Sequence, residues 1–333
     1  MRRESNTVVA RHRVAIAASV TLRSRLGVAT MEVMRGARLA IAIIAFAVGA
    51  AGCSDSDVSS DTSTSAPPVV STTVIQSESL DTSLVPPGYD TLVSGDGRTR
   101  TYRVVDLSES EPAPLLFVLH GFGGSAEGMR AYAGIEEAVQ STLQDGAIVV
   151  YPNGTGLESG LPQSWNAGGC CPFSIYEPVD DVSFFEQMID RLSSAYDVDA
   201  ERVWVVGHSN GGMMAYRLAC ELSTRVTAIG VAAGALMIDT CSPSSGVSSL
   251  HLHGTLDNVV PLDGGNIAGI TFPSARDSFE RFAIANRCTV TDVIAQCPAG
   301  MSIALQTDAQ WAHDWLPTWT TALVDFLAQE SGS

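Results

Sequence analysis

The stretch VWVVGHSNGGMMAYRLAC, residues 203–220, joins a short apolar run to an amphipathic segment through a glycine-flanked serine. Val203–Val206 is predicted to be a strand and Gly211–Leu222 a helix. A serine on the sharp turn between a strand and a helix needs glycines two residues before and two residues after it, and both are present. The bare pattern G-x-S-x-G is common, but this context predicts a nucleophile elbow with Ser209 as the nucleophile.

Outward from this turn, short apolar runs alternate with helical patterns from about Tyr89 onward. This alternation predicts the α/β class, with a mostly parallel central sheet and helices on both faces. Strands are expected at Thr99–Val105, Leu115–Leu119, Ala147–Tyr151, Val203–Val206, Ala228–Ala232 and Leu250–His253. Helices are expected at Ser183–Ala195, Gly211–Leu222, Ser274–Ala285 and Pro317–Ala328. Together with the elbow, this arrangement predicts an α/β-hydrolase fold for residues 89–333.

The base and the acid that a catalytic serine needs follow it in this fold in the order Ser, Asp or Glu, His. Of the six histidines, only His313 lies far downstream of Ser209, so it is the expected base. The acid is expected in the loop after a late strand. Asp257 follows the predicted strand Leu250–His253 and a glycine turn, which makes it the expected acid, with Asp263 as the alternative.

The segment Leu119–Gly124 (LHGFGG) ends another apolar run in a glycine-rich turn. Such a turn directs a backbone N–H toward a substrate oxygen, so the N–H groups of Phe122 and Asn210 are the expected oxyanion donors. A phosphate-binding loop is the alternative, but no lysine follows and no G-x-G-x-x-G pattern occurs. His251 and His253 face the same side of a strand but lack a third ligand in register, so packing is expected rather than a metal site. Acyl transfer by a serine, a histidine and an aspartate needs no other cofactor, and none is expected.

The chain is acidic, with 36 Asp and Glu residues against 19 Lys and Arg, and its formal net charge is −17 at pH 7. Many of the basic residues lie in the first 52 residues, so the remainder is more acidic still. A surface of this sign repels nucleic acid and anionic polymers, which argues against a nucleic-acid partner. The expected partner is a small-molecule or oligosaccharide ester, and the composition sets no oligomeric state.

Residues 1–52 are predicted to be an upstream extension followed by a signal peptide. Its apolar run, Leu39–Ala50, follows a basic segment and is too short to span a membrane comfortably. Small residues then lead into Cys53, as in a bacterial lipobox, so lipidation of Cys53 is expected, with an ordinary signal peptide as the alternative. Residues 53–88 are rich in Ser, Thr and Pro and are predicted to be a disordered tether. An extracellular protein, held at the membrane by its lipid alone, is expected.

Six cysteines follow Cys53, and an even number in an exported chain indicates disulfides. Cys288 and Cys297 flank a short Thr/Val run and are expected to close a local hairpin. The other four leave the pairing open, and the favoured solution is Cys220–Cys241 beside a vicinal Cys170–Cys171 pair.

Six motifs together resemble the secreted polyhydroxybutyrate depolymerase and feruloyl esterase family of carbohydrate esterases. They are LHGFGGS at Leu119, YPNGTG at Tyr151, SWNAGGCC at Ser164, DDVSFF at Asp180, GHSNGGMMAYRLAC at Gly207 and HGTLDNVVP at His253. The resemblance covers roughly Tyr89 to the end of the chain, and it implies an ester hydrolase with its triad on Ser209, Asp257 and His313. The family usually has glycines before its histidine, whereas DAQWAHDWLP, residues 308–317, has none.

The resemblance implies a serine esterase that acts on feruloyl esters of plant polysaccharide. Trp165 and Trp315 lie in segments expected near the site and are candidate platforms for the ferulate ring, with core packing as the alternative. A polyester-oligomer depolymerase is the alternative enzyme, and a non-catalytic surface-binding lipoprotein is the alternative from another class. The chain ends at Ser333 soon after the last predicted helix, which favours a soluble ester over a solid polyester.

Overall fold

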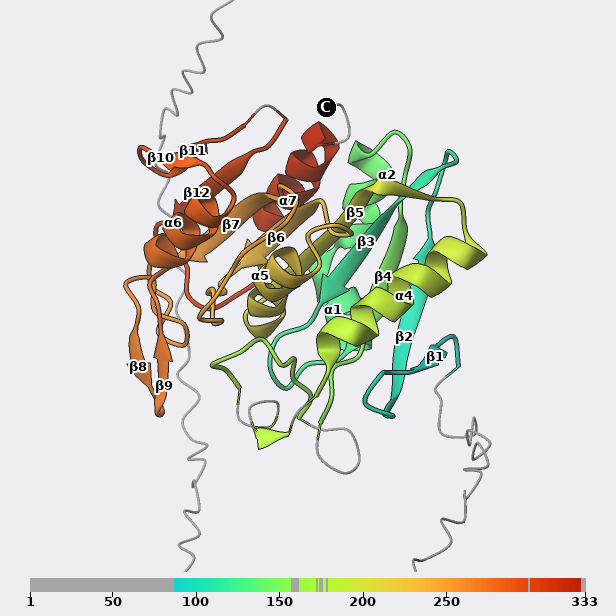
Figure 1. Cartoon of the computed structure of the whole chain (residues 1–333), viewed down its shortest axis with the longest axis horizontal. Coiled ribbons are helices and arrows are strands. Elements are labelled where there is room, and N and C mark those ends of the chain that lie inside the picture. Colours follow the sequence, from blue (N-terminus) through green and yellow to red (C-terminus); the bar gives the residue numbers. More distant parts are fainter. Residues whose placement is uncertain are drawn as a thin grey trace, which may run out of the picture. The chain divides into compact units, whose positions relative to one another are not determined.

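Figure 1 shows the computed structural model, which describes residues 87–156, 162–171, 173, 176–177, 179–298 and 300–330. The predicted upstream extension, signal peptide, lipidation site at Cys53 and nearly all of the tether lie outside the described residues. No helix within the described ranges is long and apolar enough to cross a membrane.

A ten-stranded sheet forms the centre of the part of the chain that the structure describes, in the order β1-β2-β4-β3-β5-β6-β7-β12-β11-β10. The strands from β4 to β12 in this order are parallel, and the pairs at both edges are antiparallel. The strands are β1 (Asp90–Val93), β2 (Thr99–Asp106), β3 (Ala113–Leu119), β4 (Ile148–Pro152), β5 (Val198–His208), β6 (Ala228–Ala232), β7 (Ser248–Gly254), β10 (Thr289–Val290), β11 (Ile294–Gln296) and β12 (Ile303–Asp308). A separate hairpin pairs β8 (Gly265–Ile267) with β9 (Ile270–Phe272).

Helices cover both faces of the sheet, and each face has its own apolar core. The helices are α1 (Ala126–Ala133), α2 (Ile135–Thr142), α4 (Asp181–Ala195), α5 (Asn210–Glu221), α6 (Ala275–Ala285) and α7 (Pro317–Glu330). Buried side chains of α4, α5 and α6 belong to one core, and those of α1, α2 and α7 to the other. Burying apolar area on both faces of a parallel sheet is what stabilises this class of fold. The predicted α/β architecture is confirmed.

The parallel strands bring distant parts of the sequence to one edge of the sheet. β3, β5, β7 and β12 all end at the same edge, because parallel strands share their direction. The segments that follow these four ends hold the residues predicted to carry the chemistry. Loops at the carboxyl ends of such strands are where ligands bind in open α/β sheets.

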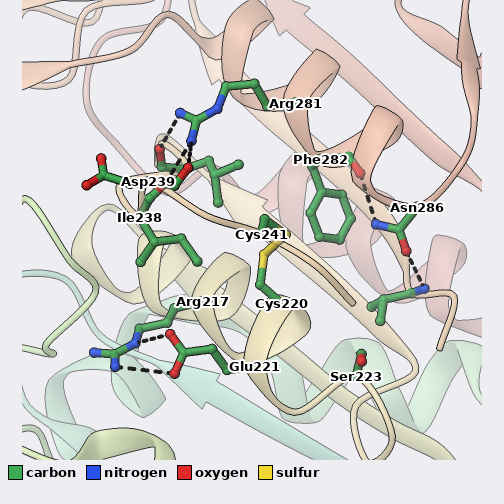
Figure 2. The surroundings of a disulfide bond; sticks show 12 residues. Arg217, Cys220, Glu221, Ser223, Ile238, Asp239, Cys241, Arg281, Phe282 and Asn286 are labelled. Atoms are coloured by element: carbon green, nitrogen blue, oxygen red, sulfur yellow. Dashed lines mark hydrogen bonds and ion pairs between the residues drawn. A yellow bond between two sulfur atoms is a disulfide. The ribbon is translucent and has the colours of Figure 1, made fainter. Parts of the chain in front are cut away.

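In the part of the chain that the structure describes, disulfides join Cys170 to Cys171, Cys220 to Cys241, and Cys288 to Cys297. Cys288–Cys297 closes the hairpin of β10 and β11. Figure 2 shows Cys220–Cys241, which joins the end of α5 to the loop after β6. Arg281 of α6 donates to the Ile238 carbonyl of that loop at 2.7 Å, so the loop is anchored from two helices.

Candidate active site

Ser209 lies in the tight turn between the end of β5 and the start of α5, and this turn gives it an unusual backbone conformation. Its φ of 54° and ψ of −119° are rare for a residue with a side chain. A Cβ on Gly207 would lie 2.3 Å from the carbonyl carbon of Gly211, and a Cβ on Gly211 would lie 2.6 Å from the Leu119 oxygen. The glycines are therefore needed because the chain crosses itself closely here, as the sequence pattern predicted.

Three side chains from separate loops form one hydrogen-bonded row at this edge. The Oγ of Ser209 lies 2.8 Å from Nε2 of His313, and Nδ1 of His313 lies 2.7 Å from Oδ2 of Asp257. The Asp257 side chain is fully buried and that of His313 is 15% exposed, so the row runs from the interior toward solvent. The structure thus brings together the three residues that the sequence predicted as nucleophile, base and acid.

The carboxylate of Asp257 is held ionised by its neighbours. Burial opposes ionisation, but hydrogen bonds from His253 and His313 and from the Val260 amide hold the pKa of Asp257 well below its usual range. The N–H groups of Val259 and Val260 both donate to Oδ1 at 2.9 Å. Asp263, the alternative acid, is exposed in a later part of the same loop.

A tight turn beside Ser209 carries one of the two predicted oxyanion donors. The Gly124 N–H donates to the Gly121 carbonyl at 3.0 Å, and Gly123 has a φ of 77°. A Cβ on Gly121 would lie 3.3 Å from the Cβ of Ser209, so the turn reaches the serine. Within the described part of the chain, the Phe122 N–H has no acceptor, which leaves it available to a substrate oxygen.

Asn210, the second predicted donor residue, is the first residue of α5, so its N–H has no acceptor within the helix. Its side chain is fully buried and forms a two-point clamp on the backbone of Trp165. The Trp165 N–H donates to Asn210 Oδ1 at 2.7 Å, and Asn210 Nδ2 donates to the Trp165 carbonyl at 3.1 Å. The clamp fixes the start of α5 against the SWNAGGCC segment.

A buried ion pair supports that segment, and sequence reasoning missed it. Arg100 on β2 donates to Asp181 at 2.7 Å, and both side chains are almost fully buried. The other oxygen of Asp181 accepts from the Asn166 N–H at 2.7 Å, next to the clamped Trp165. The pair joins residues 81 positions apart, so no local pattern could have revealed it.

Both predicted stacking platforms are wrong, because both tryptophans are buried. Trp165 is 0% exposed, and its indole N–H donates to the His120 carbonyl at 2.9 Å. Trp315 is 7% exposed, and its indole N–H donates to Thr320 Oγ1 at 2.8 Å. Neither ring has a free face for a substrate, so the alternative of core packing holds for both.

Phe122 and Tyr132, at 47% and 50% exposure, are instead exposed aromatic side chains near Ser209. They line a cavity of about 200 Å³ beside the oxyanion turn, together with Met129 and His208. The Tyr132 hydroxyl shares a hydrogen bond of 3.2 Å with Nδ1 of His208. His208 in turn lies against His313, with ring centroids 5.0 Å apart. His208 therefore contacts both the cavity and the base.

His251 and His253, the histidines weighed above as metal ligands, are both fully buried on β7. Among the residues that the structure describes, no three His, Cys, Asp or Glu side chains are grouped to hold a metal ion. His251 contacts Tyr216 and His253 instead.

Buried neutral histidines make the stability of the fold sensitive to acid. Burial lowers the pKa of His120 to about 4, and burial together with His313 lowers that of His208 to about 3. The unfolded chain therefore binds more protons than the folded chain between about pH 3 and pH 6.5. The free energy of unfolding should fall as the pH drops through this window.

Thermal unfolding midpoints between pH 7 and pH 4 measure this effect. His208→Gln, which cannot take up a proton, should show a shallower fall than the parent chain. A midpoint that stays constant over the window, or an unchanged slope in the variant, would contradict the account.

Residues 100–272, slightly more than half of the chain, match the family model described as Phospholipase/Carboxylesterase. Feruloyl esterase B of Piromyces equi is 33% identical over 187 residues, covering 53% of this chain and 33% of that protein. The putative esterase NocK of Nocardia uniformis subsp. tsuyamanensis is 33% identical over 211 residues, covering 61% and 58%. Feruloyl esterase C of Emericella nidulans is 29% identical over 221 residues, covering 64% and 70%. The chain thus spans a third of the first of these relatives and 58% of the second.

Two solved structures share the architecture. The Bacillus cereus carboxylesterase aligns with a TM-score of 0.50 at 16% identity, over 69% of this chain and 94% of that chain. A thermostable esterase aligns with a TM-score of 0.51 at 16% identity, over 72% of this chain and 61% of that chain. At such identities the likeness concerns the fold alone, and it confirms the predicted α/β-hydrolase fold.

Proposed function

The chain belongs to the phospholipase/carboxylesterase family, and from this premise we propose that it is a serine-dependent carboxylic ester hydrolase. The observation that carries the proposal is the row of hydrogen bonds from Ser209 through His313 to Asp257, at 2.8 and 2.7 Å. A serine is activated when a base lies within hydrogen-bond reach of its hydroxyl and a third group orients that base.

In the first half of the reaction, Ser209 Oγ attacks the ester carbonyl carbon while His313 Nε2 takes the hydroxyl proton. Asp257 holds the ring with Nε2 toward the serine and stabilises the positive charge that the ring acquires. His313 then gives the proton to the leaving alcohol as the carbon–oxygen bond breaks. The acyl group remains on Ser209.

In the second half, His313 takes a proton from water while the water oxygen attacks the acyl carbon. The acid leaves and the proton returns to Ser209 Oγ. The N–H groups of Phe122 and Asn210 stabilise the negative oxygen in both halves, helped by the amino-terminal end of α5. No step in this sequence needs a metal or another cofactor.

For the substrate, we propose an ester with an aromatic acyl group, of the feruloyl type found on plant polysaccharide. All three sequence relatives described above are esterases by name, and two of these are feruloyl esterases. The cavity beside the oxyanion turn supports an aromatic acyl group, because Phe122 and Tyr132 line it with partly exposed rings. Aromatic rings in contact contribute about 0.5–1.5 kcal/mol beyond area burial.

Ser209→Ala should lower the turnover of a soluble ester by about 10⁴-fold or more, because triad members act as a unit. His313→Ala should cost a comparable factor. Steady-state kinetics on a p-nitrophenyl ester, with circular dichroism as the check on folding, measure both. Near-normal turnover by a folded Ser209→Ala chain would overturn the proposal that Ser209 is the nucleophile. A folded parent chain with no ester turnover would favour the alternative of a non-catalytic surface-binding lipoprotein.

The ratio of two specificity constants tests the substrate proposal. The kcat/KM for methyl ferulate should exceed that for a hydroxybutyrate trimer. A ratio well below one would favour the alternative of a polyester-oligomer depolymerase.

The acyl cavity is tested by Tyr132→Ala, which should lower kcat/KM for methyl ferulate by about 2- to 12-fold relative to methyl acetate. Tyr132→Phe is the matched control, because it keeps the ring and should keep the ratio. Equal losses on both esters in Tyr132→Ala would remove the cavity from the acyl site.

We also propose that the protein is exported and anchored to the bacterial membrane through a lipid on Cys53. Three disulfides support an oxidising compartment, since such bonds are rare in the cytosol. Small residues before Cys53 and the Ser/Thr-rich stretch after it support the lipid anchor. Cys53→Ser should shift the protein from the membrane fraction to the medium, and an unchanged partition would contradict the anchor.

A further inference from the structure

Behind Asp257 lies a row of buried titratable side chains that the proposed reaction does not use. Tyr216 comes from α5, and His251 and His253 come from the same side of β7. All three are 0% exposed. The Tyr216 hydroxyl lies 3.1 Å from His251 Nδ1, and His251 Nε2 lies 3.1 Å from His253 Nδ1. His253 Nε2 lies 2.8 Å from the Val260 carbonyl.

The partners of these rings determine where the protons are. A carbonyl only accepts, so Nε2 of His253 carries the hydrogen. In a neutral ring, Nδ1 of His253 then accepts from His251 Nε2–H, and Nδ1 of His251 accepts from the Tyr216 hydroxyl. Burial and the neighbouring His253 lower the pKa of His251 despite the nearby Gly234 carbonyl, and burial raises the pKa of Tyr216. Both groups are therefore neutral, and their donors run from Tyr216 through His251 to His253.

The row ends on the carboxylate of Asp257. His253 Nε2 lies 3.4 Å from Oδ2 of Asp257, the oxygen that is 2.7 Å from His313. Val260, whose carbonyl accepts from His253, also donates its N–H to Oδ1 of Asp257. The Nε2–H of His253 therefore donates mainly to the Val260 carbonyl, with Oδ2 as a second, more distant acceptor, and it acts on Oδ1 through the loop that it holds.

We propose that His253 is a positioning residue for the proposed triad, orienting the Asp257 carboxylate and drawing off part of its negative charge. The proposal rests on the proposed function, because it assigns the partner of the catalytic acid. Oδ2 faces two imidazole rings, His313 at 2.7 Å and His253 at 3.4 Å, so less of its charge acts on His313 than in a triad where the acid faces one ring.

Loss of the His253 donor should change the pH dependence of the reaction. Without the His253 donor, the full charge of Asp257 acts on His313, which then holds a proton more tightly in the free enzyme. The acid limb of the kcat/KM profile should move to higher pH. The titratable groups facing this pair are His208 beside His313, and His251 and Tyr216 behind His253.

The experiment compares His253→Phe with His251→Phe in the full chain. Both histidines lie on β7 and are fully buried, and both substitutions remove the ring nitrogens. Only His253 lies close to Asp257. Rates are expressed per active site, counted with a fluorophosphonate. His253→Phe should lower kcat/KM by about 10- to 100-fold, by analogy with the loss of an outer partner of a metal ligand. It should also move the acid limb upward, whereas His251→Phe should leave the limb in place.

His253→Gln provides the conservative test, because its amide returns an N–H near the position of Nε2 and should restore the limb. Equal limb shifts in both Phe variants, or an unmoved limb in His253→Phe, would overturn the proposal. Should the Phe variants fail to fold, nitrogen-15 NMR of histidine-labelled parent chain decides: His253 must be neutral with its proton on Nε2, and a proton on Nδ1 overturns the proposal. A parent chain that neither hydrolyses esters nor reacts with the fluorophosphonate would instead overturn the proposed function.

Discussion

The geometry of the site depends on the close approach of two backbone segments beside Ser209, the end of β3 and the start of α5. The serine adopts a positive φ, and the glycines two residues away leave no room for a Cβ because β3 and α5 lie against them. This constraint places Ser209 above the sheet edge, where its hydroxyl meets a histidine from a loop 104 residues later. Backbone strain of this kind persists only where the packing around the residue holds the strained conformation in place. Two apolar cores, one on each face of the sheet, supply that packing.

Buried polar groups hold the site in place from behind. Asn210 clamps the backbone of Trp165, and the ion pair of Arg100 with Asp181 holds the adjacent residue. A buried ion pair costs desolvation, so its retention here is best understood as fixing geometry rather than adding stability. On the other side, the row from Tyr216 to His253 supports the acid. The oxyanion side and the acid side of the site thus each have their own buried support.

Much of this arrangement was predictable because the decisive signals are local or ordered along the chain. The elbow follows from glycine positions, and His313 and Asp257 follow from chain order, since few histidines lie downstream of Ser209. The two tryptophans were misjudged because sequence gives no information on which ring faces a neighbour covers. Arg100 and Asp181 were missed because their pairing is long-range. The short edge strands β10 and β11 have two and three residues, too few to show an alternating pattern.

The central claim is that Ser209, activated by His313, is a covalent nucleophile. Mass spectrometry of the intact protein after reaction with a fluorophosphonate, followed by peptide mapping, tests it most directly. The account predicts a single adduct on the peptide that contains Ser209. An adduct on another residue, or a folded chain that hydrolyses esters and acquires no adduct, would contradict it.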